Sequence, residues 1–163
     1  MKKVEAYTDG SSLGNPGPGG YGAVLVFVDA EGVEHKRELS QGYKLTTNSR
    51  MEIAGVVAVL EALNQPCEVT ITSDSKYVVD SIEKHWLDSW IRRGWVKSDK
   101  NPVLNQDLWK RVVDLKAKHR LKMKWVKGHA GHPMNERCDE LARSAASKSN
   151  LPNDEGYILK LGS

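Results

Sequence analysis

The fold of this chain is decided by one stretch, Val126-Lys127-Gly128-His129-Ala130-Gly131-His132-Pro133-Met134-Asn135-Glu136-Arg137-Cys138-Asp139. We expect it to run from a strand, through a loop, into a helix. Pro133 disfavours a helical backbone at the residue before it. Asn135 is a suitable N-cap, and small or apolar residues follow it at helical spacing. The pattern therefore predicts that Asp139 lies in the first turn of this helix.

An acid in the first turn of a helix stabilises the helix dipole, and Asp139 taken alone needs no other explanation. Three further acids favour a different interpretation. Asp9 and Asp74 each end a segment of alternating residues typical of a strand, and Glu52 lies on an apolar helix. Asp74 alone could be a helix N-cap, but sites in α/β folds gather at strand ends. We therefore expect the four carboxylates to converge.

Composition indicates a single soluble globular domain. The chain has 163 residues, of which 39% are hydrophobic and 28% charged. No apolar run approaches the roughly 20 residues of a membrane span, and the acidic, alternating N-terminus does not resemble a signal peptide. Cys67 and Cys138 form no metal-type pair and suit a reducing compartment. We expect a cytoplasmic protein without a membrane partner.

The net charge of +3 is unevenly distributed. Residues 86–127 contain twelve Lys or Arg and four Asp or Glu, so the rest of the chain is net acidic. A basic middle segment indicates a face for a polyanion, although an ordinary solvated face would have the same charge.

Hydrophobic periodicity predicts alternating strands and helices. Strands are expected over residues 3–9, 22–28, 33–43, 69–74 and 122–126. Helices are expected over residues 48–64, 76–84, 104–118 and 135–148. Six glycines between positions 10 and 22 predict a turn-rich segment, which is not a P-loop because no Gly-Lys-Ser/Thr closes it.

The helix over residues 48–64 should be largely buried, because apolar residues cover nearly its whole circumference. Glu52 and Glu61 are its only acids. They are nine residues apart, which at about 100° per residue places them on opposite sides. At most one of them is expected to reach the site, and a Glu on such a helix needs a partner, a metal or a proton.

Residues 86–101 combine three tryptophans with four basic side chains. Trp86 and Trp90 are four residues apart, so they would share a helix face and could belong to the core. Gly94 and the polar residues after it favour a projecting loop instead.

In this order, the motifs resemble those of bacterial type 1 ribonuclease H over about residues 3–148. The motifs are Thr8-Asp9-Gly10-Ser11, Gly14-Asn15-Pro16-Gly17, Thr47-Asn48-Ser49-Arg50-Met51-Glu52, Ser73-Asp74-Ser75, Trp95 with its basic neighbours, and Val126-Lys127-Gly128-His129 through to Asp139-Glu140-Leu141-Ala142. The resemblance implies an α/β ribonuclease H-like fold, a five-stranded mixed sheet with helices on both faces. It implies a catalytic domain over residues 1–149 with a basic handle at about 86–101, followed by a C-terminal tail over 150–163.

The resemblance also implies an endonuclease that hydrolyses the RNA strand of RNA–DNA hybrids, working as a monomer without an obligate protein partner. The catalytic residues it implies are Asp9, Glu52, Asp74, His129 and Asp139, and the four acids are also the metal ligands. The substrate-binding residues it implies are Asn15, Thr47, Asn48, Lys76, Trp86, Trp90, Arg92, Arg93, Lys97, Lys100 and Asn135.

Physical chemistry agrees with this assignment. Four convergent carboxylates repel one another and would take up protons unless cations were bound. Two Mg²⁺ ions, or Mn²⁺ in their place, would relieve that repulsion through carboxylate oxygens. Two ions about 4 Å apart can activate a water and stabilise the leaving 3′-oxygen, leaving 5′-phosphate and 3′-hydroxyl ends. His129 would take a proton from the water or deliver one as product leaves.

Three alternatives remain open to test. A zinc site of His129, His132 and Cys138 has too few soft ligands to close. A transposase or exonuclease of the same superfold would act on DNA, because a fold does not fix a substrate. A non-catalytic hybrid-binding module would not need all four acids. The chain also departs from the commonest bacterial pattern: the handle is less densely basic, and four positions differ, namely Ser12, Ser49, Lys76 and Met123.

Overall fold

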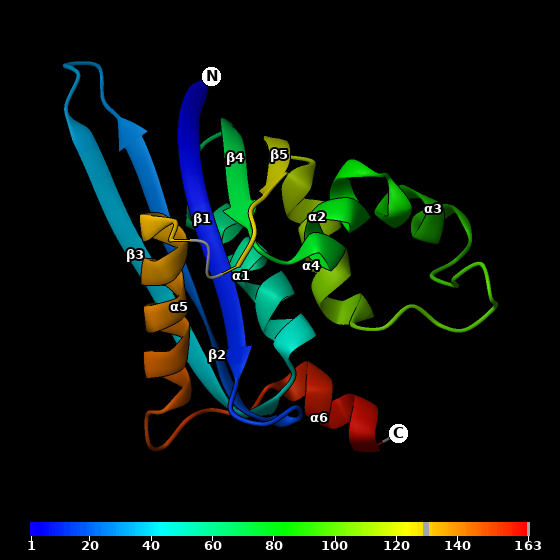
Figure 1. Ribbon diagram of the computed structural model, residues 1–163. Helices are drawn as coiled ribbons and strands as arrows, with labels where there is room; N and C mark the ends of the chain where they lie inside the picture. The colour runs from blue at the N-terminus through cyan, green and yellow to red at the C-terminus, as the bar shows by residue number, and fades with distance from the viewer. Residues whose placement is uncertain (129–130, 163) are drawn as a thin grey trace.

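The computed structural model describes residues 1–128 and 131–162, and its centre is a five-stranded sheet in the order β3-β2-β1-β4-β5 (Figure 1). The strands are β1 (Lys2–Ser12), β2 (Gly17–Val28), β3 (Glu34–Thr46), β4 (Cys67–Ser73) and β5 (Arg120–Trp125). β1, β2 and β3 pair in antiparallel fashion, whereas β4 and β5 run parallel to β1. The expected mixed sheet is therefore confirmed.

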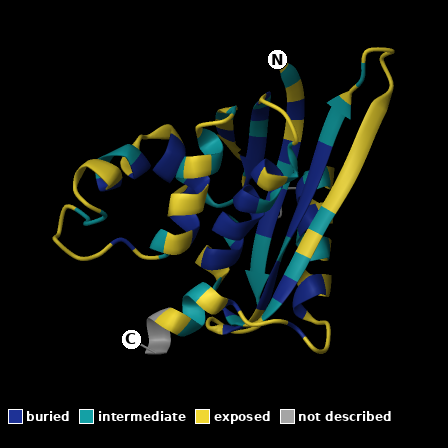
Figure 2. Ribbon diagram, turned by 180° about the vertical axis from the view of Figure 1, so that it is seen from behind, coloured by how far each residue is buried: buried dark blue, intermediate teal, exposed yellow. Residues whose placement is uncertain are grey.

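Helices cover both faces of the sheet, as expected. The helices are α1 (Asn48–Ala62), α2 (Lys76–Glu83), α3 (Trp86–Arg92), α4 (Gln106–Lys116), α5 (Pro133–Ala146) and α6 (Glu155–Gly162). Figure 1 shows α5 in front of β1, β2 and β3 and α1 behind the sheet, with α4 packed against α1. Buried residues concentrate in the central strands and α1, while much of edge strand β3 is exposed (Figure 2). None of the described helices is long and apolar enough to cross a membrane.

The glycine-rich segment is mostly strand, so the prediction of a turn-rich segment over residues 10–22 was wrong. β1 continues to Ser12 and β2 already begins at Gly17. These glycines allow helices to approach the sheet closely. A Cβ at Gly22 would lie 2.4 Å from the carbonyl oxygen of Cys138 in α5, and one at Gly10 would lie 2.5 Å from the backbone nitrogen of Glu52 in α1.

The start of α5 also differs from the prediction. The helix begins at Pro133, and the N-cap is His132, whose Nδ1 accepts a hydrogen bond from the backbone N–H of Asn135 at 3.3 Å. Proline suits the first helical position, where no partner for its missing N–H is needed. Asn135 is therefore inside the helix rather than its N-cap. Asp139 consequently lies in the second turn, not the first.

The segment over residues 86–101 is part helix and part loop. α3 occupies its first half, and a loop projects beyond it from the body of the molecule (Figure 1). Trp90 is buried and packs edge-on against Trp109, with ring centroids 5.9 Å apart. Trp86 is exposed. The core interpretation is thus right for Trp90, and the projecting-loop interpretation is right for the residues after Gly94.

The C-terminal segment packs onto the body instead of extending from it. The carboxylate of Asp154 accepts a hydrogen bond from Arg50 at 2.7 Å and another from the hydroxyl of Thr46 at 2.6 Å. Arg50 also pairs with Asp107 of α4, at 2.7 Å. The Arg50 side chain is only 2% exposed, so the buried guanidinium requires both carboxylates. This ion-pair network joins the tail to α1.

Candidate active site

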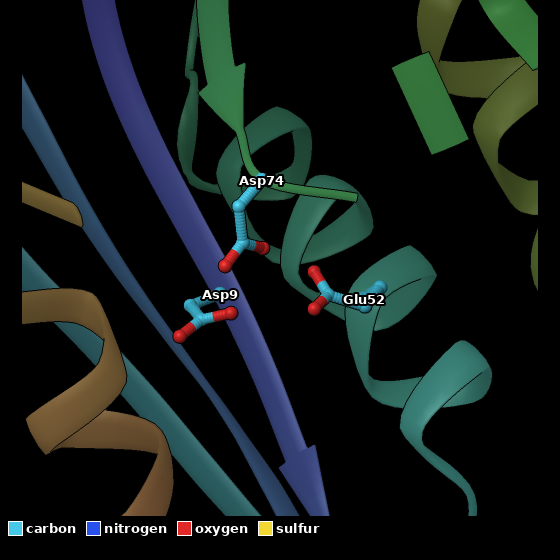
Figure 3. A group of neighbouring side chains, drawn as sticks. All are labelled: Asp9, Glu52 and Asp74. Carbon is cyan, nitrogen blue, oxygen red and sulfur yellow. The ribbon is translucent and has the colours of Figure 1, made fainter. Parts of the chain in front are cut away.

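Three carboxylates meet where β1, β4 and α1 come together (Figure 3). They belong to Asp9 in β1, Glu52 in α1 and Asp74, which directly follows β4. One oxygen from each lies within 4.8 Å of the others. Figure 3 shows the three side chains pointing toward one another. The expected convergence is therefore present for these three acids.

Sheet register and one glycine explain this convergence. Thr8 in β1 pairs with Ser73, the last residue of the parallel strand β4, so the residues that follow them, Asp9 and Asp74, lie side by side. Gly10 has no Cβ, and α1 therefore approaches β1 closely enough for Glu52 to reach the same point. Thr47 begins α1, because its hydroxyl accepts a hydrogen bond from the backbone N–H of Arg50 at 3.2 Å.

The acids strongly perturb one another. Burial, followed by the negative charges of Asp74 and Asp139, raises the pKa of Asp9 to about 7. Burial raises the pKa of Glu52 well above its ordinary value, and the charges of Asp9 and Asp74 add to the effect. Among the described residues, the buried Oε2 of Glu52 has no hydrogen-bond partner. Without a cation, the cluster therefore holds protons near neutral pH.

This donor set fits a hard divalent cation. Carboxylate oxygens are the ligands that Mg²⁺ and Mn²⁺ prefer, and a bound cation would satisfy the orphaned Oε2 of Glu52. It would also remove the electrostatic reason for protonation, since it favours the ionised carboxylates. Asp9, Glu52 and Asp74 are therefore the residues that would hold the metal.

Comparison with known proteins agrees with the geometry. The family model described as RNase H matches residues 1–147. The chain belongs to the ribonuclease H family. A ribonuclease H of Lachnoclostridium phytofermentans is 56% identical over 153 residues, which cover 93% of this chain and 97% of that protein. The predicted resemblance is thereby confirmed.

Solved structures of other ribonucleases H have the same fold. LC9-RNase H1, described as a type 1 RNase H with the type 2 active-site motif, aligns with a TM-score of 0.81 and 31% identity, covering 100% of this chain and 82% of that one. LC11-RNase H1, solved in complex with RNA/DNA hybrid, aligns with a TM-score of 0.62 and 26% identity, covering 90% of this chain and 98% of that one.

Asp139, the fourth acid expected in this ribonuclease H family member, stands apart from the other three. It is not in the group of carboxylates within 4.8 Å. Its Oδ2 accepts a hydrogen bond from Nε of Arg143, one turn later in α5, at 2.8 Å. The negative charge of Asp139 nevertheless contributes to raising the pKa of Asp9, so the two carboxylates are close enough to repel one another.

The loop before α5 begins beside the acid cluster. A Cβ at Gly128 would lie 2.9 Å from Oδ2 of Asp74. His129, the expected proton carrier, lies outside the described residues. The other residues of the alternative zinc site have local roles, since His132 caps α5 and the thiol of Cys138 donates to the carbonyl of Tyr7 at 3.2 Å. Burial raises the pKa of the Cys138 thiol to about 12, which disfavours the thiolate that zinc requires.

Three expected substrate-binding residues form a polar group at the start of α1. The backbone N–H of Asn48 donates to the side-chain oxygen of Asn15 at 3.1 Å, and Ser12 donates its hydroxyl to the side chain of Asn48 at 3.0 Å. Thr47 is the adjacent N-cap. Asn135 is buried and lies away from this group in α5, where its backbone N–H bonds His132. Lys76 begins α2 and is exposed, two residues after Asp74.

The handle residues divide into exposed and buried. Trp86 is exposed, whereas Trp90 is buried in the core and offers little surface to a ligand. The basic residues Arg92, Arg93, Lys97 and Lys100 lie in and after α3. Arg92 donates to the Ser89 hydroxyl at 3.2 Å, and Lys97 pairs with Asp99 at 3.8 Å.

One side chain at the site was not singled out from the sequence. The indole Nε1 of Trp125 donates to the backbone oxygen of Asp74 at 3.1 Å. Nothing in its local sequence pattern distinguishes Trp125 from the other strand residues.

Proposed function

We propose that this member of the ribonuclease H family hydrolyses the RNA strand of RNA–DNA hybrids, using two divalent metal ions bound by its acid cluster. The observation that supports this most strongly is the meeting of Asp9, Glu52 and Asp74 within 4.8 Å, with an orphaned carboxylate oxygen among them. Asp139 is the proposed fourth ligand, and its carboxylate would exchange Arg143 for the metal.

The metal we propose is Mg²⁺, with Mn²⁺ as a substitute, because both prefer carboxylate oxygen. When bound, the ions supply the charge that activates a water for in-line attack and stabilises the leaving 3′-oxygen. Asp9 in β1, Glu52 in α1 and Asp74 after β4 would hold and position the two ions. We assign His129 as the group that carries a proton at neutral pH, because an imidazole titrates in that range.

Substrate selection is proposed to rest on two surfaces. The polar group of Asn15, Thr47 and Asn48 would contact the backbone, where 2′-hydroxyls distinguish RNA from DNA. The second surface is the handle, whose phosphate contacts supply affinity without sequence preference. Its proposed contacts are Trp86, Arg92, Arg93, Lys97 and Lys100, with Lys76 nearer the acids. Trp90 and Asn135 are omitted because both are buried. We place this activity in the cytoplasm, carried out by a monomer.

The experiment uses end-labelled RNA–DNA hybrid, duplex DNA and duplex RNA, each with Mg²⁺ or with EDTA. The proposal predicts cleavage of the RNA strand of the hybrid alone, in Mg²⁺ alone, with 5′-phosphate and 3′-hydroxyl ends. Cleavage of duplex DNA would instead support a transposase or exonuclease. Binding of hybrid without cleavage would support a non-catalytic module. Either result would overturn the proposal.

A further inference from the structure

Trp125 is a large aromatic residue left exposed beside the acid cluster. It ends β5 and pairs with Ser73, the residue before Asp74, across parallel strands. Alternate residues of a strand share a face, so Trp125 is on the same face as the buried Met123. Trp125 is nevertheless 49% exposed. Trp125 therefore extends a row of buried side chains to the protein surface, next to a carboxylate of the acid cluster. Its exposure needs an explanation.

One hydrogen bond holds the indole ring, and a second holds the backbone at the strand end. Its Nε1–H donates to the backbone oxygen of Asp74 at 3.1 Å, which satisfies the only polar atom of the side chain. The next residue, Val126, donates its backbone N–H to the carbonyl of Ser73 at 3.0 Å, so the strand end is also held. The ring therefore has a defined position next to Asp74 and keeps half its surface accessible.

A positive charge lies over the same ring. The Nζ of Lys76 is 5.7 Å from the ring centroid of Trp125, within the range of a cation–π contact. Lys76 is itself exposed, and it begins α2 directly after the Asp74-Ser75 turn. An accessible aromatic surface and an ammonium thus lie side by side next to one carboxylate of the cluster. This combination suits a sugar–phosphate backbone, since the ring can pack on a sugar and the ammonium can pair with a phosphate.

We propose that Trp125 joins Lys76, itself already proposed as a substrate contact, in a subsite for the sugar–phosphate backbone of the cleaved strand, next to the phosphate at the acid cluster. The subsite rests on the proposed function, because it places the scissile strand across Asp74. It is separate from the polar group at the start of α1 and from the handle. Bases inside a duplex are stacked on each other, so the ring meets a sugar rather than a base.

Three substitutions separate the components of the subsite. Trp125→Phe keeps an aromatic ring and removes the N–H, Trp125→Ala removes both, and Lys76→Met removes only the charge. Lys122→Met is the matched control, because Lys122 is an exposed lysine of β5 on the face opposite to Trp125. Thermal unfolding of each variant is measured first, to establish that it folds as the wild type does.

Hybrid affinity is measured by fluorescence anisotropy at several salt concentrations, with every substitution placed in an Asp9→Asn background so that substrate is not consumed. Trp125→Ala should weaken binding roughly tenfold, because it removes the apolar ring surface that a sugar would cover. Trp125→Phe should stay within about threefold of its parent, because most of that ring surface remains. Lys76→Met should weaken binding and reduce the salt slope by about one, and Lys122→Met should leave both unchanged.

A second measurement uses the Asp9-containing enzymes in Mg²⁺. The subsite predicts that KM rises in Trp125→Ala while the Mg²⁺ concentration for half-maximal rate stays constant. Unchanged hybrid affinity in Trp125→Ala would overturn the proposal. The proposal would also be overturned if Trp125→Phe and Trp125→Ala lost kcat equally and both shifted the Mg²⁺ dependence. The indole N–H would then serve only to hold Asp74. Wild-type protein that binds hybrid without cleaving it would overturn the proposed function alone, since the affinity series would still test the subsite.

Discussion

Replacing Asp9 with Asn should stabilise the metal-free protein and abolish its activity. Asp9 is buried beside two other acids, and its pKa is raised to about 7. The folded protein therefore binds this proton more tightly than the unfolded chain does. Linkage requires that the contribution of Asp9 to metal-free stability is greatest below about pH 4, declines as pH rises, and is lost above about pH 7.

The size of this effect follows from the pKa. Each pH unit between the ordinary value of 3.8 and about 7 corresponds to about 1.4 kcal/mol, so the full loss is about 4 kcal/mol. Asn cannot ionise and does not suffer this loss. The stability advantage of Asp9→Asn over wild type should therefore grow by about 2.5 kcal/mol between about pH 5 and about pH 8.

Urea unfolding in EDTA, followed by circular dichroism at both pH values, measures the difference directly. Glu5→Gln is the control, because it neutralises an exposed acid of the same strand. Adding Mg²⁺ at the higher pH should stabilise the wild type more than Asp9→Asn, since the ion binds ionised carboxylates of the folded state. An advantage that fails to grow with pH, or an Asn variant that is less stable at about pH 8, would refute the account of the cluster.

Three more predictions concern other parts of the molecule. Asp154→Asn should lower the free energy of unfolding, measured in urea, by about 3 kcal/mol, because it leaves the buried Arg50 partly uncompensated. The control, Glu155→Gln, should lower it little. Equal stability of the two variants would contradict the ion-pair network. His129→Ala should lower kcat by roughly 10²-fold and retain Mg²⁺ binding in calorimetry, and lost Mg²⁺ binding would make it a ligand. Removing the handle charges should raise KM far more than it lowers kcat and should flatten the salt dependence, and an unchanged salt slope would show that the handle does not meet substrate. The handle charges to remove together are Arg92, Arg93, Lys97 and Lys100.

Part of the site could be predicted from strand patterns alone. Asp9 and Asp74 each end an alternating segment, which was enough to single them out as candidates. The parallel pairing of β1 with β4, which brings the two residues together, comes from the structure. Periodicity separated Glu52 from Glu61 but did not choose between them. The structure shows the reason for the choice: Glu61 pairs with Arg111 on the outer side of α1, whereas Glu52 faces the cluster.

Other features depend on contacts that periodicity does not describe. The glycines of β2 resembled turn residues, because the helices that require their missing Cβ atoms are distant in sequence. Asn135 was a plausible cap, but Pro133 fits the first helical position and transfers the cap to His132. The tail has no strong pattern of its own. Its placement depends on Asp154 meeting a guanidinium 104 residues away.

The central claim is that Asp9, Glu52 and Asp74 bind the divalent ions that support hydrolysis. The most direct test is a crystal structure with Mn²⁺ and a non-cleavable hybrid, using anomalous scattering to locate the metal. We predict Mn²⁺ coordinated by carboxylate oxygens of these three residues and by the substrate phosphate, with Asp139 released from Arg143 to complete the site. Hybrid bound across the site with Mn²⁺ absent from these carboxylates, or held by other residues, would contradict the account.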